Sequence, residues 1–193
     1  MKTPPDQARL ALAEATAQRI LLHERIMEPP VPVKELLKQY AVVSPFEHPT
    51  EMSFCLEQDS IWYVFINSKL SKRSPSFIHA HEMGHLFMNH LHFDNTHLTP
   101  PQFQLLKHEA DHFAENLLMP ADWIRSACGR SKSVNEYSLA ALVERFSVSP
   151  DTMKNRLQHL GIHYNPLSHD SCKTDVNHPL HSANDNLHLP GHH

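Results

Sequence analysis

The residues best suited to chemistry in this chain are two histidines and a glutamate in the segment His81-Glu82-Met83-Gly84-His85. Histidines four positions apart project from one face of a helix, so their imidazoles can bind a single metal ion. The intervening Glu82 then lies beside the metal, where its carboxylate can accept a proton from a water molecule. The H-E-x-x-H spacing therefore predicts a hydrolytic zinc site on a helix.

Composition alone could produce such a motif, because the chain has 18 histidines among its 193 residues. The alternative is a histidine-rich helix that binds no metal. The flanking segments 77–80 and 86–88 are apolar and continue one helix, which favours the metal site. Gly84 lies inside that helix although glycine costs about 1 kcal/mol there relative to alanine. Its presence indicates that another backbone or a ligand approaches closely.

A catalytic zinc site needs a third protein ligand and one open position. Apolar residues recur at helical spacing over 105–117, which predicts a second helix that begins near Pro101, ends at Pro120 and buries one face. Glu109 lies beside the buried face, where a carboxylate requires a partner, and a metal would be one. On spacing alone, three other side chains of this helix compete with it: Asp111, His112 and Glu115.

These segments resemble the ImmA/IrrE family of metallopeptidases. After the H-E-x-x-H motif, Glu109-Ala110-Asp111-His112-Phe113-Ala114 and then Leu117-Leu118-Met119-Pro120 match the family's long E-A-(D/N)-x-F-A-x-x-L-L-M-P pattern. The resemblance implies His81, His85 and Glu109 as the ligands of one Zn2+ ion and Glu82 as the general base. Ser76 and Asn89 stand where the family often has arginine and histidine; these departures leave the ligand set intact and concern the support of the helix.

The motif and the resemblance together predict a zinc-dependent endopeptidase. Zinc lowers the pKa of its bound water to about 7, and Glu82 would pass the proton of that water to the departing amine. A second donor is expected to stabilise the oxyanion. Five side chains remain open for this role: His79, His108, His112, Tyr63 and Tyr137.

The resemblance also implies a substrate, a helix-turn-helix repressor of the XRE type encoded nearby, whose cleavage relieves repression. The alternative is a non-catalytic regulator that binds DNA or a partner and uses zinc as a structural staple. Its basis is the segment 138–157, where two amphipathic helices meet at a turn capped by Ser149, as in a helix-turn-helix. Only Lys154 and Arg156 are cationic in the second helix, so direct DNA binding is not expected.

Bulk composition fits a globular protein of the cytoplasm. The formal net charge of −4 disfavours general binding to nucleic acid. No apolar run reaches the length of a membrane span, and the N-terminus lacks the apolar core of a signal peptide. Cys55, Cys128 and Cys172 are odd in number and widely spaced, as expected for reduced thiols.

The predicted fold class is α+β, with a zincin-like metallopeptidase core, a small sheet expected to be antiparallel, an active-site helix and a helix-turn-helix-like element after it. The predicted domains are 1–126 for the peptidase, 127–164 for the helical element packed on it, and 165–193 for a disordered, His-rich tail. The tail could bind metal loosely, but a solvated tail is the simpler interpretation.

Individual elements are also predicted. We expect a helix from Thr3 to about Met27, a short helix around Leu36, Leu37 and Tyr40, a strand that half-buries Met52, Phe54 and Leu56, and a more buried strand over 61–66. The last strand or its neighbour could bind substrate as an added strand. His90, His92 and His97 are expected in an exposed loop, with a second metal site as the alternative.

Overall fold

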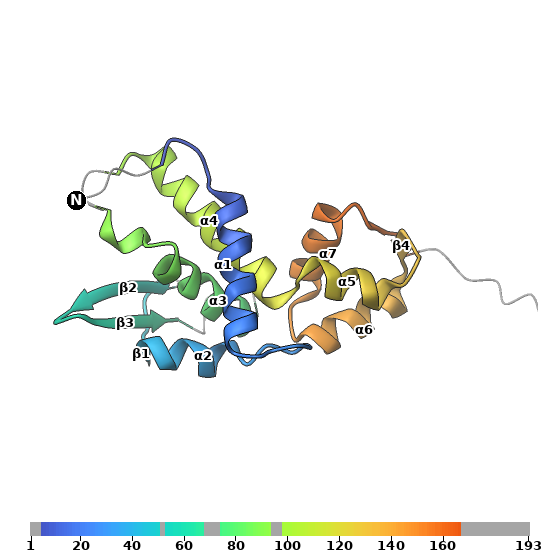
Figure 1. The fold of residues 1–193 in the computed structure, drawn as a ribbon, viewed down its shortest axis with the longest axis horizontal. Helices are drawn as coiled ribbons and strands as arrows, with labels where there is room; N and C mark the ends of the chain where they lie inside the picture. The colour runs from blue at the N-terminus through green and yellow to red at the C-terminus, as the bar shows by residue number, and fades with distance from the viewer. Residues whose placement is uncertain (1–4, 51–52, 68–73, 94–97, 167–193) are drawn as a thin grey trace, which may run out of the picture.

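Residues 5–50, 53–67, 74–93 and 98–166 are described by the computed structural model of the protein. Thr3, Met52, Cys172 and nearly all of the predicted tail lie outside these residues. Among the described residues, no helix is long and apolar enough to cross a membrane. In Figure 1 the main sheet lies at one end of the molecule, and the C-terminal helices, coloured yellow to orange, lie at the other.

The elements confirm the α+β class. In chain order they are α1 (Leu10–His23), α2 (Val33–Tyr40), β1 (Ala41–Pro45), β2 (Ser53–Gln58), β3 (Ile61–Ile66), α3 (Pro75–Phe87), the 3-10 turn η1 (His90–His92), α4 (Pro100–Leu118), α5 (Ala121–Cys128), β4 (Ser133–Val134), α6 (Glu136–Phe146), α7 (Pro150–His159) and β5 (His163–Tyr164). The strand β4 pairs only with β5, away from the main sheet.

The three-stranded sheet has the order β1-β3-β2. The strands β2 and β3 are antiparallel, with Cys55 opposite Val64, but β1 runs parallel to β3, with Val43 opposite Val64. The expectation of an antiparallel sheet is therefore wrong for β1. The strand β1 was not predicted from the sequence, and its connection to β3 runs through β2, which allows the parallel pairing. The buried strand β3 is central, so the two outer strands carry the sheet's edges.

The prediction of which face of β2 is buried is wrong. Phe54 and Leu56 were expected to point inward, yet both are exposed. The small residues Ser53 and Cys55 occupy the opposite, partly buried face, toward α3. Strand alternation was read correctly, but the inward residues are polar because they face a site rather than an apolar core.

The central helices α3 and α4 pack against each other closely. Ser74 caps α3 by accepting a hydrogen bond from the Phe77 backbone, and Thr99 and Gln102 form a capping box at the start of α4. A Cβ atom on Gly84 would lie 2.9 Å from Ala110 Cα of α4. This confirms the expectation that Gly84 permits the close approach of another backbone.

The first helix is shorter than predicted. It begins at Leu10, with Arg9 as its N-cap residue, and ends at His23. Ala13, Ala17, Ile20 and Leu21 are buried against the core, as the periodicity predicted, whereas Met27 lies outside the helix and is exposed. Proline is tolerated at the start of a helix but does not by itself begin one. Residues 5–9 therefore lie outside α1 although the sequence there has prolines.

The C-terminal helical element has the predicted form. Asn135 caps α6, Ser149 caps α7, and Pro150 opens α7. Leu142, Phe146 and Leu157 belong to the same buried cluster as residues of α1, α3 and α4. The two C-terminal helices therefore share a core with these helices.

Candidate metal centre

The helix α3 brings His81 and His85 together. They lie one turn apart, and their Nε2 atoms are separated by 3.1 Å. Both side chains line a cavity of about 400 Å3, whose other walls come from β2, η1 and α4. Two imidazole nitrogens that converge at a cavity are suited to zinc, which prefers histidine nitrogen among its ligands.

The other ring nitrogen of each histidine has a partner on the far side. His81 Nδ1 lies 2.8 Å from Asp111 Oδ1, and His85 Nδ1 lies 2.9 Å from His90 Nδ1. Histidines that bind metals commonly use their second nitrogen in this way, because the contact fixes the orientation of the ring. The pair therefore has the support that a metal site requires.

The predicted base, Glu82, is buried and is held by β2. Only 3% of its surface is exposed. Ser53 Oγ donates to Oε1 at 2.6 Å, and Cys55 Sγ donates to Oε2 at 2.7 Å. Burial raises the pKa of the Cys55 thiol, and the neighbouring Glu82 carboxylate raises it further, so the thiol keeps its proton and remains a donor.

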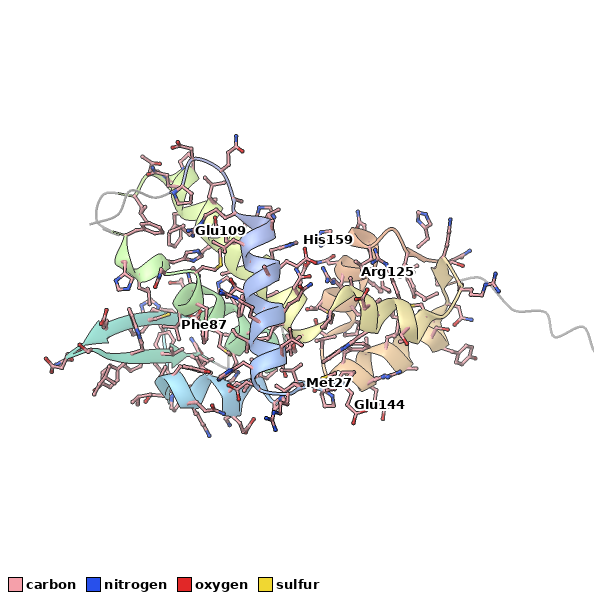
Figure 2. The ribbon with its side chains drawn as sticks, in the orientation of Figure 1. Met27, Phe87, Glu109, Arg125, Glu144 and His159 are labelled. Atoms are coloured by element: carbon pink, nitrogen blue, oxygen red, sulfur yellow. The ribbon has the colours of Figure 1, made fainter. Side chains whose placement is uncertain are left out.

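Glu109 is placed apart from the histidine pair. It is fully buried, and its carboxylate accepts hydrogen bonds from Arg9, at 2.7 Å from the backbone nitrogen and 2.6 Å from a guanidinium nitrogen. Its Oε2 also lies 2.9 Å from His90 Nε2. Figure 2 shows Glu109 on α4 beside the beginning of α1. Glu109 does not line the cavity, whereas Asp111 of the same helix does.

Only part of the predicted ligand set therefore converges in the structure. His81 and His85 converge, but Glu109 would have to leave Arg9 and His90 to join them. Within the described residues, no three His, Cys, Asp or Glu side chains are grouped as a metal would need. The ligand role of Glu109 stays a prediction. Of its competitors, Asp111 is next to His81, while Glu115 and His112 line a separate cavity between α4 and α7.

The electrostatics of the pair favour metal binding. Burial lowers the pKa of His85 well below its ordinary value, and the neighbouring histidines lower it further. Burial also lowers the pKa of His90. A histidine must be neutral to bind a metal, so a depressed pKa keeps the lone pair available. The His85 imidazole fits a zinc ion in this respect.

Glu109 is charged despite its burial. Burial alone would raise its pKa, but hydrogen bonds from His90 and Arg9 outweigh that effect and lower the pKa to about 2. The carboxylate and the guanidinium form an ion pair in which Glu109 is buried and the Arg9 side chain is 31% exposed. Glu109 therefore has Arg9 and His90 as its hydrogen-bond partners.

The five candidates for the oxyanion donor are not at the cavity. His79 Nδ1 lies 2.6 Å from the Pro75 carbonyl within its own helix, and Tyr137 is 84% exposed. Among the described residues that line the cavity, Lys107 is the cationic one, and none of the five is included. Lys107 is therefore the better placed donor, and the spacing of the sequence gave no reason to select it.

Comparison with known families decides the class of the protein. The family model Peptidase_M78, described as the IrrE N-terminal-like domain, matches residues 35–158, which is more than half of the chain. The chain belongs to this ImmA/IrrE family of metallopeptidases. The family implies a metal, typically zinc. No protein of curated function matches the chain.

One solved structure similar to this IrrE-like chain is a Mycobacterium tuberculosis transcriptional regulator. The two superpose with a TM-score of 0.56 over 76% of this chain, at 17% sequence identity. The match covers 46% of that regulator, so the present chain spans less than half of its length. At this identity the likeness shows a shared fold only.

The cavity of this IrrE-like chain has an apolar wall beside the histidine pair. The apolar side chains that line it are Phe54, Phe77, Ile78, Leu91, Phe103 and Leu106. Phe54 and Phe103 are among the exposed large hydrophobic residues, so the wall is open to an approaching chain. Lys107 Nζ lies 4.6 Å from the centre of the Phe103 ring and adds a positive charge to the same wall.

The second helix of the helix-turn-helix-like element is not free to read DNA through Arg156. This side chain is 3% exposed. It donates to the Met119 carbonyl at 2.9 Å and to Asn116 Oδ1 at 2.8 Å, and it lies 3.7 Å from Glu115. Arg156 fastens α7 to the end of α4, so one of the two cations considered for phosphate contacts is buried.

Sequence reasoning missed four residues that support the centre: Arg9, Ser53, Cys55 and His90. His90 was expected in an exposed loop, but it is 2% exposed and contacts both His85 and Glu109. The sequence did contain a signal for His90. The family often has a histidine where this chain has Asn89, and His90 is the next residue. Arg9, Ser53 and Cys55 carry no local signal, since their partners are distant in sequence.

Proposed function

We propose that the protein is a zinc-dependent endopeptidase with a zincin-like core. The observation that supports this most directly is the convergence of His81 and His85 Nε2 atoms at a cavity next to the buried Glu82. Two imidazole ligands and an adjacent carboxylate base on one helix are part of the set that hydrolysis at zinc needs, and a third protein ligand completes it. The proposed ligands are His81 and His85, with Glu109 as the predicted third.

The chain's own residues divide the remaining work. When bound, zinc supplies a Lewis acid that activates water and polarises a carbonyl. Glu82 accepts the proton of the attacking water and delivers it to the leaving amine. Ser53 and Cys55 hold its two oxygens, so the carboxylate has one orientation. Lys107 lines the cavity where it could stabilise an oxyanion.

The surroundings of the pair support a peptide substrate. The strand β2 is an edge of the sheet and also contributes Ser53 and Cys55 to the centre. An extended peptide can add to such an edge through backbone hydrogen bonds. The predicted substrate strand 61–66 is central and already paired on both sides, so its neighbour β2 is the candidate. The apolar wall would accommodate a side chain of that peptide.

The proposed target is a transcriptional repressor of the XRE type, encoded nearby, whose cleavage relieves repression. Membership of the ImmA/IrrE family supports this proposal. We also propose that residues 1–126 act as the peptidase unit and 127–164 as a helical unit packed on it. Cys55 and Cys128 are free thiols, which supports a reducing compartment such as the cytoplasm.

The test combines metal content with cleavage. Elemental mass spectrometry on the wild-type protein should give about one tightly bound zinc per chain, lost in His81→Ala and His85→Ala. The Glu82→Gln variant should retain the zinc, because the amide keeps the shape of the side chain, and should lose cleavage of a co-expressed XRE-type repressor. Loss of a general base typically costs about 100- to 10,000-fold in rate.

The same measurements include outcomes that contradict the proposal. An active Glu82→Gln protein would remove Glu82 from the role of base. If the wild-type protein takes up no zinc after reconstitution, the proposed zinc-dependent hydrolysis is contradicted, because the site would lack the metal that activates water. Metal content of Glu109→Ala and Asp111→Ala, measured in parallel, identifies which carboxylate of α4 belongs to the ligand set.

A further inference from the structure

The main sheet has a second apolar face, on the side away from α3. Side chains alternate along a strand, and paired residues of neighbouring strands share a face. Ser53 and Cys55 of β2 point toward Glu82 of α3, so their neighbours along the strand point the opposite way. The pairing of β2 with β3 and of β3 with β1 extends this opposite side across the sheet. Six residues form it, and they are called the exposed sheet face: Val42, Phe54, Leu56, Ile61, Tyr63 and Phe65.

The exposed sheet face is a contiguous apolar surface that solvent reaches. Four of its side chains are large hydrophobic groups that remain 38% to 47% exposed: Val42, Phe54, Leu56 and Ile61. The Phe54 ring stacks on Phe65 with ring centres 4.6 Å apart, and it meets Phe46 edge-on at 5.0 Å. A sheet with one solvated face usually has polar residues there. A contiguous apolar surface on a folded protein instead marks a site of interaction.

The border of the exposed sheet face is acidic. The segment 41–67, which contains all three strands, has four acidic residues and neither lysine nor arginine. Two of the acidic residues, Glu57 and Asp59, are exposed at the turn between β2 and β3, close in sequence to Leu56 and Ile61. Opposite charges around an interface steer the encounter and disfavour wrong partners. A partner that fits this surface therefore has an apolar patch bordered by lysine or arginine.

The exposed sheet face continues to the cavity of the histidine pair. Phe54 belongs to this face and also lines the cavity, as do its neighbours Ser53 and Cys55. The strand β2 is an edge of the sheet, so a segment that adds to this edge lies between the two surfaces. A protein whose segment enters the cavity can therefore cover the exposed sheet face at the same time.

We propose that the exposed sheet face is a docking surface for the folded body of the protein substrate, while the cavity receives its scissile segment. The partner is recognised by an apolar patch with a basic border. This proposal rests on the proposed function, since it takes a protein as the substrate. A repressor presents basic side chains to the phosphates of its DNA site, so the proposed target meets the charge requirement.

The first test compares two substrates that share one scissile bond. One is the intact XRE-type repressor encoded nearby, and the other is a synthetic peptide with only the residues around the bond that is cut. The wild-type protein should cut the intact repressor with the lower KM. Val42→Lys combined with Ile61→Lys should raise that KM about tenfold or more and leave kcat unchanged, because only docking is lost. Both constants for the peptide should stay as in the wild type.

Matched controls separate docking from general effects of the substitutions. Leu12→Lys combined with Leu22→Lys makes the same change of charge at two exposed apolar positions of α1, and it should leave all constants unchanged. Glu57→Gln combined with Asp59→Asn should raise the KM for the intact repressor and weaken its dependence on salt. Glu144→Gln, at an exposed position of α6, should do neither. Circular dichroism confirms that each variant is folded.

A binding measurement without cleavage tests the same surface. The Glu82→Gln protein is immobilised, and the Kd of the intact repressor is measured by surface plasmon resonance. Adding Val42→Lys and Ile61→Lys should raise this Kd about tenfold or more. An equal effect of the two substitutions on the intact repressor and on the peptide would overturn the proposal, and so would no effect on either.

Two further outcomes have separate meanings. If size-exclusion chromatography with light scattering shows a wild-type dimer that Val42→Lys with Ile61→Lys converts to a monomer, a second copy of the chain covers the exposed sheet face and the proposal fails. If the zinc-loaded wild-type protein cuts neither substrate, the proposed function is refuted. The Kd measurement then still decides whether the exposed sheet face binds the repressor, because it does not require cleavage.

Discussion

At the scale of single residues, the ion pair of Arg9 and Glu109 is the contact whose loss should be easiest to measure. Glu109 is fully buried, and three nitrogens of Arg9 donate to it. Glu109 is the buried partner and Arg9 is 31% exposed, so removing Arg9 would leave the buried carboxylate without its cationic partner, which is costly. The pair therefore makes a distinct contribution to stability, separate from any metal.

Its pH dependence has a definite sign. The pKa of Glu109 is about 2 in the folded protein and 4.5 for the reference carboxyl, so its stabilisation is fully present above pH 4.5 and declines as pH falls toward 2. The difference between these values corresponds to about 3 kcal/mol of unfolding free energy. We expect Glu109→Gln to be less stable by up to about this amount at pH 7, with the gap narrowing as pH falls below 4.5.

Urea unfolding of the metal-free protein between pH 7 and pH 3.5 measures this effect. Glu144→Gln is the matched control, because Glu144 lies exposed on α6 (Figure 2) and should give no pH-dependent difference. A constant gap between wild type and Glu109→Gln at all pH values would show that the ion pair does not titrate as described.

Residues with local signals could be predicted from the sequence, and residues with distant partners could not. The two histidines of the motif are four positions apart on one helix, so their convergence follows from helical geometry. Arg9 and Glu109 are 100 positions apart, and Ser53 and Glu82 are 29 apart on different elements. Nothing near Arg9 in the sequence indicates its partner, because only the packing of α1 on α4 brings them together.

At the scale of elements, the helix α4 contacts both the histidine pair of α3 and the C-terminal helix α7. Its middle carries Asp111 toward His81, and its C-terminal end carries Asn116 and the Met119 carbonyl toward Arg156. Helices α3 and α1 also pack on it. The helical element is thereby fixed to the same helix that carries Asp111 and Glu109.

Among the side chains of α7, Arg156 should contribute most to holding this helix against the end of α4. Replacing it with methionine leaves Asn116, Glu115 and the Met119 carbonyl without their cationic partner in a buried place. We expect Arg156→Met to lower the unfolding free energy by about 3 kcal/mol, as measured for broken buried pairs. Chemical unfolding monitored by circular dichroism checks this. Gln158→Met, at an exposed position of the same helix, should change stability by less than about 0.5 kcal/mol.

Elements were predicted best where their apolar spacing was regular and least well at their ends and faces. The helices α3, α4, α6 and α7 have strong caps and were located correctly. The strand β1 was missed because Ala41–Pro45 follows α2 without a turn signal. The face of β2 was inverted because Phe54 and Leu56 look like core residues, while the site required the smaller Ser53 and Cys55 inside.

At the scale of the whole molecule, the family match is narrower than the folded unit. The match begins at residue 35, yet α1 precedes it and buries Ala13, Ala17, Ile20 and Leu21 in the common core. We expect a fragment of residues 35–158 to unfold or aggregate, since it exposes this apolar surface and lacks Arg9. A fragment of residues 5–166 should show a cooperative unfolding transition. Thermal unfolding of the two, side by side, tests the difference.

The long span between Arg9 and Glu109 also has a consequence for biosynthesis. Arg9 emerges from the ribosome well before its carboxylate partner, which lies 100 residues later. Contacts of large sequence separation close slowly, because the loop entropy is lost before the contact forms. The hydrogen bonds of Glu109 with Arg9 and His90 can therefore form only when α4 has been made and has docked on α1. A nascent polypeptide that already contains both histidines of the motif would still lack these contacts.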